Sequence, residues 1–287
     1  MEQKLFTDGF AWGEGLRWHN GYLYFSDIYG KKIFRANREG VKEVVLEPND
    51  MPSGLGFLPD GSLLAVSGGK KQILRLQNGK SSVYADLAEL CVGINDMVVD
   101  SHGNVYVGAY GYEMQFYKGG KAEGWIFHID STQKVHKVCE GLLSPNGMVV
   151  TEDGKQLIVA DTFKNQLVSF NLNCDGTPTE VCVWANLPAG PDGICYDSEG
   201  AVWAALPNLA KVVRIQKGGK IVEEISCSDT PLCCTLGGEE RKTLFIVTVP
   251  AHKELNTDDL SNPEKQQKIA GSKIVMLPGY VSGAGFP

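Results

Sequence analysis

The stretch NGMVVTEDGKQLIV, residues 146–159, carries the pattern that decides the fold. A small polar residue and a glycine precede a short apolar run, and a second apolar run follows a turn at Asp153-Gly154. An Asp-Gly pair between two alternating apolar runs is a strong hairpin signal. The stretch therefore predicts two antiparallel strands. It also leaves Asn146-Gly147 at the start of the first strand, where no hairpin turn needs an asparagine.

The same pattern recurs along the whole chain. Clear copies read SGLGFLPDGSLLAV from residue 53, NDMVVDSHGNVYVG from 95 and DGICYDSEGAVWAA from 192. EGLRWHNGYLYFSD from 14 repeats the pattern with a one-residue deletion before its turn, and CCTLGGEERKTLFIV from 233 is degenerate. Successive copies start 39 to 51 residues apart. That spacing is typical of one four-stranded blade of a β-propeller.

Further strand-like runs complete each copy. A third run follows every hairpin, such as NQLVSFNL over 165–172, and a fourth follows most of them, such as TEVCVWANL over 179–187. Six copies predict an all-β, six-bladed β-propeller of four-stranded blades, with residues 1–287 as a single domain. The N-terminal QKLFTDG resembles a fourth strand without a blade. We expect it to complete the last blade and close the ring, which removes exposed sheet edges.

Composition narrows the possible partners. The net charge of −7 argues against nucleic acid and anionic membranes, because both attract basic patches. No apolar run approaches the roughly 18 residues of a membrane-spanning helix, and the first residues lack an apolar signal segment. The eight cysteines include no C-x-x-C pair, as expected of buried thiols in a cytosolic protein. We therefore expect a cytoplasmic protein with a small-molecule substrate; no particular oligomeric state is indicated.

The first residue of each copy is the main candidate for function. The first strand of a propeller blade lines the central channel, so these six residues converge on the axis. They are Glu14, Ser53, Asn95, Asn146, Asp192 and Cys233. Four of them carry the oxygen ligands that hard cations prefer, and two nearby carboxylates would repel each other without a partner. The alternative is that Asn-Gly and Asp-Gly only serve the backbone, which does not account for Glu14.

The junctions after the second strands lie on the same face as these axial residues. Two long stretches are expected to add loops to that face. They are AYGYEMQFYKGGKAEG over 109–124, in the third copy, and a polar stretch over 250–272, in the sixth, which contains His252. Phe163 follows the second strand of the fourth copy on the same face. Loops around an axial polar cluster form a concave pocket, which is the usual setting of an active site.

At these residues the chain resembles the senescence marker protein/gluconolactonase/luciferin-regenerating enzyme family. The resemblance covers nearly the whole chain and is carried by GEGLRWHNGYLYFSDI, GINDMVVDSHGNVYVG, LLSPNGMVVTEDGKQLIVADT, GPDGICYDSEGAVWAA and LGGEERKTLFIVT. It implies a six-bladed propeller with one divalent metal ion, Ca²⁺, Zn²⁺, Mg²⁺ or Mn²⁺, on its axis. Metal ligands would be Glu14, Asn146 and Asp192, with Asn95 beside the metal or holding substrate. Known members are mostly lactonases.

One position departs from the sugar-lactone members of the family. Those of the regucalcin type carry an arginine two residues before the equivalent of Asn95, whereas this chain has Gly93. The guanidinium that would bind sugar hydroxyls is absent. The stretch over 109–124 instead offers aromatic and apolar side chains that include Tyr110, Tyr112 and Met114. This predicts a less polar or aromatic substrate, bound by these residues together with Asn95, Phe163 and His252.

Three hypotheses for function follow. A metal-dependent lactonase would use the cation to polarise the ring carbonyl, with Asp192 as the preferred base and Asp96 as an alternative. A metal-dependent isomerase or lyase would use the same site, with Asp96 or His252 moving the proton. A non-catalytic, metal-binding interaction propeller is the third, because a fold does not determine a function.

Overall fold

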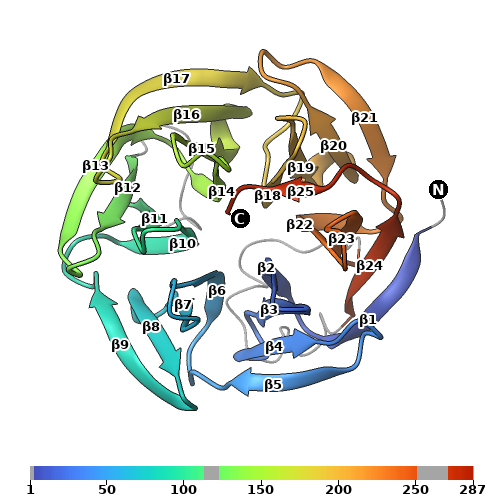
Figure 1. Ribbon diagram of the computed structural model, residues 1–287, viewed down its shortest axis with the longest axis horizontal. Helices are drawn as coiled ribbons and strands as arrows, with labels where there is room; N and C mark the ends of the chain where they lie inside the picture. The colour runs from blue at the N-terminus through green and yellow to red at the C-terminus, as the bar shows by residue number, and fades with distance from the viewer. Residues whose placement is uncertain (1–2, 113–122, 251–270, 287) are drawn as a thin grey trace.

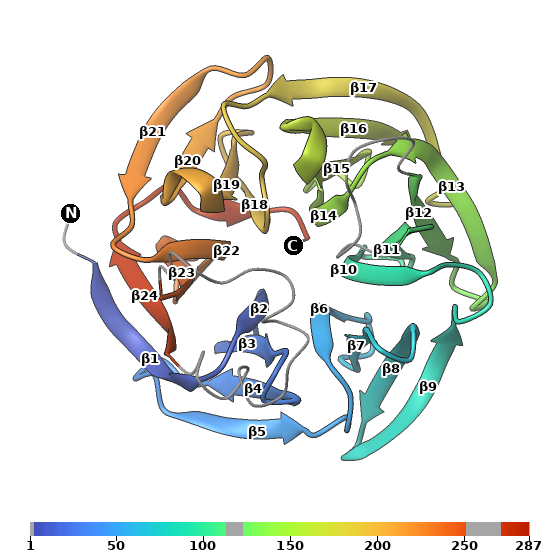
Figure 2. The same cartoon turned by 180° about the vertical axis from the view of Figure 1, so that it is seen from behind.

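The computed structural model describes residues 3–112, 123–250 and 271–286. Six sheets surround a central channel, each with its first strand innermost (Figures 1 and 2). The predicted all-β fold of six blades is therefore confirmed. Among the described residues the helical elements are two short 3₁₀ turns, η2 (Thr162–Lys164) and η3 (Pro207–Leu209), and no helix there is long and apolar enough to cross a membrane.

The strands follow the six predicted copies. Blade one contains β2 (Gly13–His19), β3 (Tyr22–Asp27), β4 (Lys32–Ala36) and β5 (Lys42–Leu46). Blade two contains β6 (Pro52–Phe57), β7 (Leu63–Ser67), β8 (Gln72–Gln77) and β9 (Lys80–Asp86). Blade three contains β10 (Gly93–Val99), β11 (Val105–Tyr110), β12 (Gly124–Ile129) and β13 (Val135–Leu142).

The second half of the chain repeats this order. Blade four contains β14 (Pro145–Val150), β15 (Gln156–Asp161), β16 (Gln166–Leu172) and β17 (Pro178–Asn186). Blade five contains β18 (Ile194–Asp197), β19 (Val202–Leu206), β20 (Lys211–Ile215) and β21 (Ile221–Ser226). Blade six contains β22 (Thr230–Gly237), β23 (Thr243–Val249) and β24 (Ser272–Pro278).

Blade six takes its outer strand from the other end of the chain. β1 (Lys4–Phe10) pairs antiparallel with β24, so this sheet combines the two ends of the sequence. The hydrophobic core is divided in the same way as the ring. Six clusters of buried side chains each lie between two neighbouring blades, and the cluster between blades six and one includes Phe6 and Phe10 of β1. Packing between blades therefore holds the ring together.

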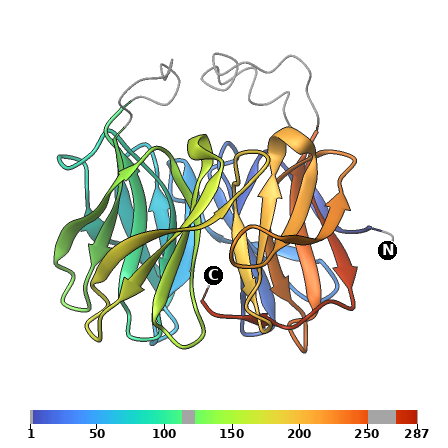
Figure 3. The same cartoon turned by 90° about the horizontal axis from the view of Figure 1, so that it is seen from above.

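The C-terminal segment adds an element that the repeat pattern did not predict. β25 (Gly283–Ala284) pairs with the innermost strand β18, and Phe286 forms a bridge with Val150 of blade four. Figures 1 and 3 place this segment across the centre of one face, opposite the face that carries η2 and η3. We call these the tail face and the loop face. The tail face is also the side of the turns between the first and second strands.

Candidate metal centre

The structure brings the predicted axial residues to the innermost strands. Glu14, Asn95 and Asn146 lie on β2, β10 and β14, and Asp192 lies just before β18. Each of the four retains partial exposure, while the residues that follow them along the strands are buried. Their polar side chains therefore line the channel. The side chains two positions further on lie in the hydrophobic clusters between the blades, namely Leu16, Met97, Met148 and Ile194.

A local irregularity accompanies the axial position in five blades. The register between the first and second strands shifts between Glu14 and Arg17, Pro52 and Leu55, Ile94 and Met97, Pro145 and Met148, and Pro231 and Cys233. A bulge of this kind re-aims side chains and is common next to active sites. The alternation of a regular strand is interrupted at the residues that face the channel.

In the four copies with glycine after the axial position, that glycine packs against the next blade. A side chain at Gly15 would approach the carbonyl oxygen of Ser53 to 2.5 Å, and one at Gly147 would approach that of Asp192 to 2.6 Å. Close approach of two backbones is a common reason for glycine. Gly147 therefore serves the contact between blades four and five, whereas Asn146 is left facing the channel.

The two axial carboxyl groups carry an unfavourable charge. Burial, then Asp192 and then Asp96, raise the pKa of Glu14 well above its usual value. Burial followed by the charge of Asp96 raises the pKa of Asp192 to about 7, although a hydrogen bond from Asn146 opposes this shift. The structure thus gathers negative charge in a place that disfavours it. A cation there would restore the balance.

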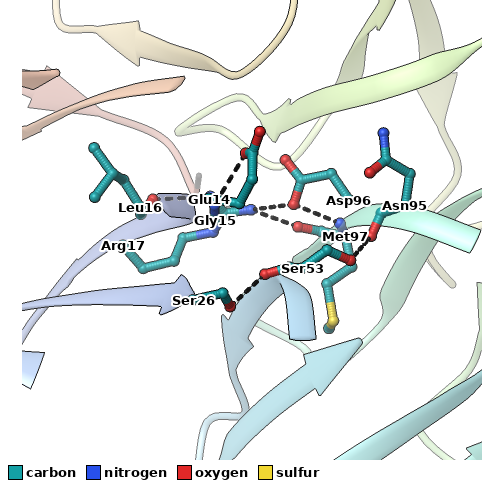
Figure 4. A network of polar contacts seen from close by, with 9 residues as sticks. All are labelled: Glu14, Gly15, Leu16, Arg17, Ser26, Ser53, Asn95, Asp96 and Met97. Carbon is teal, nitrogen blue, oxygen red and sulfur yellow. Dashed lines mark hydrogen bonds and ion pairs between the residues drawn. The ribbon is translucent and has the colours of Figure 1, made fainter. Parts of the chain in front are cut away.

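Asp96 differs from its two acidic neighbours because it has a partner. Arg17 Nη2 donates to Asp96 Oδ1 at 3.1 Å and to the carbonyl oxygen of Met97 at 2.6 Å, and both charged side chains are buried. Figure 4 shows Arg17 of blade one reaching blade three, with the side chains of Glu14, Asp96 and Asn95 extending to one side of this network. Arg17 therefore pairs with one of the three carboxylates, although burial outweighs this partner and raises the pKa of Asp96.

Arg17 is not among the predicted site residues, although the sequence contains a signal for it. The fourth position of the other copies holds Gly, Val, Val, Cys and Leu, so a charged residue there is an exception. Asp96 is likewise the only acidic residue at the second position, where four copies have glycine. The two exceptions have opposite charges and pair with each other. Gly54 leaves space for this, because a side chain there would lie 2.5 Å from Asp96 Oδ1.

The other two axial residues are engaged in contacts with the protein. Ser53 donates its hydroxyl to the carbonyl oxygen of Asn95 at 2.7 Å. Cys233 is buried, and its side chain hydrogen-bonds Glu14. A serine nucleophile and a zinc site built on cysteine both lack support here.

The donor set fits a divalent cation that prefers oxygen. Among the described residues no three His, Cys, Asp or Glu side chains form a metal-ligand group. In a metal site here, the two carboxylates of Glu14 and Asp192 would be supplemented by the amide oxygens of Asn146 and Asn95. Such a mixture of carboxylate and amide oxygens suits Ca²⁺, Mg²⁺ or Mn²⁺.

Tyr110 lies beside Gly93, the position at which this chain lacks the arginine of the sugar-lactone members. It pairs with Gly93 across β10 and β11, and its ring occupies the space that a side chain at position 93 would enter. Burial raises the pKa of the Tyr110 phenol. Its ring lies 5.4 Å from that of Tyr112, whose hydroxyl donates to the Leu143 carbonyl oxygen at 2.7 Å. The aromatic ring has taken the position of the missing side chain.

The remaining predicted substrate residues have different outcomes. Phe163 lies on η2 at the loop face and is 41% exposed. Met114 and His252 fall outside the described residues. Asp161, two residues before Phe163, is fully buried. It accepts hydrogen bonds from the backbone N–H groups of Leu143 and Ser144 at 3.0 and 2.9 Å, and so fixes the segment that enters β14.

Comparison with known proteins identifies relatives that align along nearly the whole chain. Lactonase drp35 of Staphylococcus epidermidis is 26% identical over 292 aligned residues, which cover 94% of this chain and 84% of the relative. Regucalcin of Oryctolagus cuniculus is 25% identical and covers 93% of each chain. The solved structure of a calcium-binding regucalcin from Agrobacterium tumefaciens superposes with a TM-score of 0.76 at 20% identity, over 98% of this chain and 96% of that one.

The protein-family model described as the SMP-30/gluconolactonase/LRE-like region matches residues 12–250 of this chain. These residues include all six axial positions. The chain therefore belongs to the SMP-30/gluconolactonase/LRE-like family.

Proposed function

We propose that the protein is a metal-dependent lactonase whose substrate is less polar than a sugar lactone. One observation carries the metal: Glu14 and Asp192 face each other's charge on the axis with raised pKa values and no basic partner among the described residues. The lactonase chemistry is supported by relatives named as lactonases, including drp35. When bound, the cation would polarise the carbonyl of the substrate and stabilise negative charge on its oxygen.

The protein residues divide the remaining work. Asp192 is the candidate base, because a carboxylate has two oxygens and one can accept a proton from the water that attacks the lactone. Asn146 hydrogen-bonds Asp192 and so fixes its orientation. Asp96 is a weaker candidate, since Arg17 and the Met97 backbone N–H both donate to its Oδ1. Asn95 cannot act as a base and would position the substrate or the cation.

Tyr110 supports the substrate class. Its ring fills the space beside Gly93, close in sequence to Asn95, and so offers a flat apolar surface where sugar-lactone members have a cation. A lactone with an aromatic or aliphatic body would gain from contact with this ring, whereas the hydroxyls of an aldonolactone would find no guanidinium.

A lactone panel tests the chemistry. Hydrolysis of dihydrocoumarin, an aliphatic δ-lactone and gluconolactone is measured after chelation and after each metal is restored. We expect Asp192→Ala to lose about 10³-fold in kcat, while the exposed turn variant Asp153→Ala keeps full activity. Full hydrolytic activity of protein that is verified to be metal-free would refute the proposal that the reaction depends on a metal ion. A product without the mass of one added water would refute hydrolysis.

Tyr110 is tested by relative rather than absolute rates. We expect Tyr110→Ala to lower kcat/KM on dihydrocoumarin by about tenfold relative to gluconolactone, because a ring contact is lost on one substrate only. Tyr84→Ala serves as the matched control, since this tyrosine lies on the outer strand β9. An equal loss on both substrates would show that Tyr110 does not set the preference.

A further inference from the structure

A cavity of about 690 Å³ opens on the tail face, at the opposite end of the channel from the axial carboxylates. One side is formed by the turns around Asn20, Gly61 and Ser101, which join the first and second strands of blades one to three. The other side is formed by Arg241 and the C-terminal Gly285 and Phe286. The volume is in the range of small-molecule pockets.

The guanidinium of Arg241 has few hydrogen-bond partners in this cavity, which is unfavourable for a charged group. Its Nη2 donates one long hydrogen bond of 3.5 Å to the carbonyl oxygen of Ala284, and its Nε is buried without a partner among the described residues. No carboxylate of the described residues forms an ion pair with it. Its backbone has a φ of 53°, which is uncommon for a residue other than glycine. A half-buried guanidinium with so few partners destabilises a protein unless a ligand completes it.

The other charged groups around the cavity are already engaged. Asp60 forms an ion pair with Arg75. Asp100 accepts a hydrogen bond at 2.8 Å from the Asn104 side chain. Arg17, which is 93% buried at the inner end of the cavity, is paired through Nη2, although its Nε has no partner either. The half-buried guanidinium of Arg241, in contrast, forms no ion pair among the described residues, and its remaining N–H groups favour an anion.

A flat apolar wall lies beside these donors. The rings of His19 and Phe57 stack with centroids 3.8 Å apart and planes inclined by 6°. Burial lowers the pKa of His19, so its ring is neutral at physiological pH. Phe286 and Leu58 add further carbon surface to the lining. A ligand that spans this wall and Arg241 needs an apolar body and one anionic end.

We propose that the tail-face cavity binds a small organic monocarboxylate with a flat apolar body, its carboxylate on Arg241 and its body against the His19–Phe57 wall. A planar guanidinium matches a carboxylate with two parallel hydrogen bonds, and such charge-assisted bonds are among the strongest in proteins. The site is separate from the axial carboxylates and does not depend on the lactonase proposal.

Benzoate is the probe, with benzyl alcohol as its uncharged counterpart. Calorimetric titration of the full chain is expected to show benzoate binding that Arg241→Gln weakens by roughly 10- to 100-fold and that Lys242→Gln, the exposed neighbour, leaves unchanged. Asp192→Asn should retain binding, because it alters the other end of the channel. Undetectable benzoate binding at millimolar concentration would overturn the proposal. So would equal affinity of the wild type and Arg241→Gln, or binding lost only in Asp192→Asn.

Two further variants separate a ligand site from a structural role of Arg241. Arg241→Met keeps the carbon stem and removes the unpaired charge, so without benzoate its melting temperature should equal or exceed that of the wild type. Ser101→Trp adds a ring at the exposed mouth of the cavity and should abolish benzoate binding without a loss of stability. A lower melting temperature for Arg241→Met would mean that Arg241 anchors the C-terminal segment, and full binding by Ser101→Trp would place benzoate elsewhere.

Discussion

The two ends of the central channel carry opposite kinds of unbalanced charge. Toward the loop face, Glu14 and Asp192 repel each other and form no ion pair with a basic side chain of the described residues, whereas on the tail face Arg241 forms none with a carboxylate of those residues. Between the two ends, Arg17 and Asp96 form a buried pair of opposite charges. The comparison indicates that charge is balanced where the fold alone needs it and unbalanced where a ligand is expected.

Buried carboxylates elsewhere support this distinction. Asp197 is fully buried, yet it accepts hydrogen bonds from Trp203 Nε1 at 3.1 Å and from Arg214 Nε at 2.7 Å. Asp27 accepts three backbone N–H groups at 2.9 to 3.1 Å. Burial of an acid in this fold is therefore usually accompanied by donors. The axial pair differs because its pKa values stay raised although Asn146 hydrogen-bonds Asp192 and Cys233 hydrogen-bonds Glu14. A bound cation would offset this negative charge.

The largest expected effect on stability concerns the ion pair between the two ends. We expect Arg17→Leu or Asp96→Leu alone to lower the free energy of unfolding by about 3–5 kcal/mol, because each leaves a buried charge without its partner. The double variant should recover much of this loss, since both charges are removed together. Urea denaturation measures all three.

The exposed pair of Arg38 and Glu239 supplies the control for that cycle. Its disruption should change the free energy of unfolding by less than about 1 kcal/mol, because water screens exposed charges. Additive losses of unfolding free energy in the Arg17 and Asp96 variants would show that the two side chains act independently. Such a result would contradict the interpretation that the charges in the middle of the channel balance each other while those at its two ends do not.

A smaller effect is expected from pH in the metal-free protein. Raised carboxyl pKa values mean that the folded state binds more protons than the unfolded chain, whose carboxyls titrate near about 4. Stability should therefore fall as the pH rises from about 4 toward 7, the pKa to which Asp192 is raised. Bound metal should reverse this trend, because its ligands must be deprotonated.

Thermal unfolding across this pH range, with chelator and with added metal, measures the effect. Asp192→Asn removes one of the raised groups and should flatten the slope in chelator. A chelated wild-type protein that becomes more stable from pH 5 to 7 would contradict the electrostatic account of the loop-face end.

The repeat explains why so much was predictable. Each copy carries an Asp-Gly, His-Gly, Asn-Gly or similar turn between two apolar runs, so local chemistry sets the hairpins and the period sets the ring. The same register places Glu14, Asn95, Asn146 and Asp192 on the inner strands without any knowledge of contacts. The location of a residue that follows the repeat can be predicted from the sequence, because equivalent positions of the six copies occupy equivalent places in the blades.

What escaped prediction is what breaks the repeat. Arg17 and Asp96 are 79 residues apart, and their pairing depends on the missing side chain of Gly54 in the blade between them. The ring of Tyr110 lies over Gly93 because these two residues are paired across β10 and β11. The direction in which the ring points depends on the packing of its neighbours and has no signal in the repeat. β25 has only two residues, too few for a periodic signal, and its place depends on the edge that β18 offers. Each of these is set by tertiary contacts.

Metal stoichiometry tests the central claim most directly. Purified protein is chelated, titrated calorimetrically with Ca²⁺, Mg²⁺, Mn²⁺ and Zn²⁺, and compared with Glu14→Gln, Asp192→Asn and the distant control Asp153→Asn. The account predicts one divalent ion per chain, an affinity reduced by about 100-fold or more in each axial variant, and no change in the control. Absence of binding by the wild type, or binding that both axial variants retain, would contradict the account.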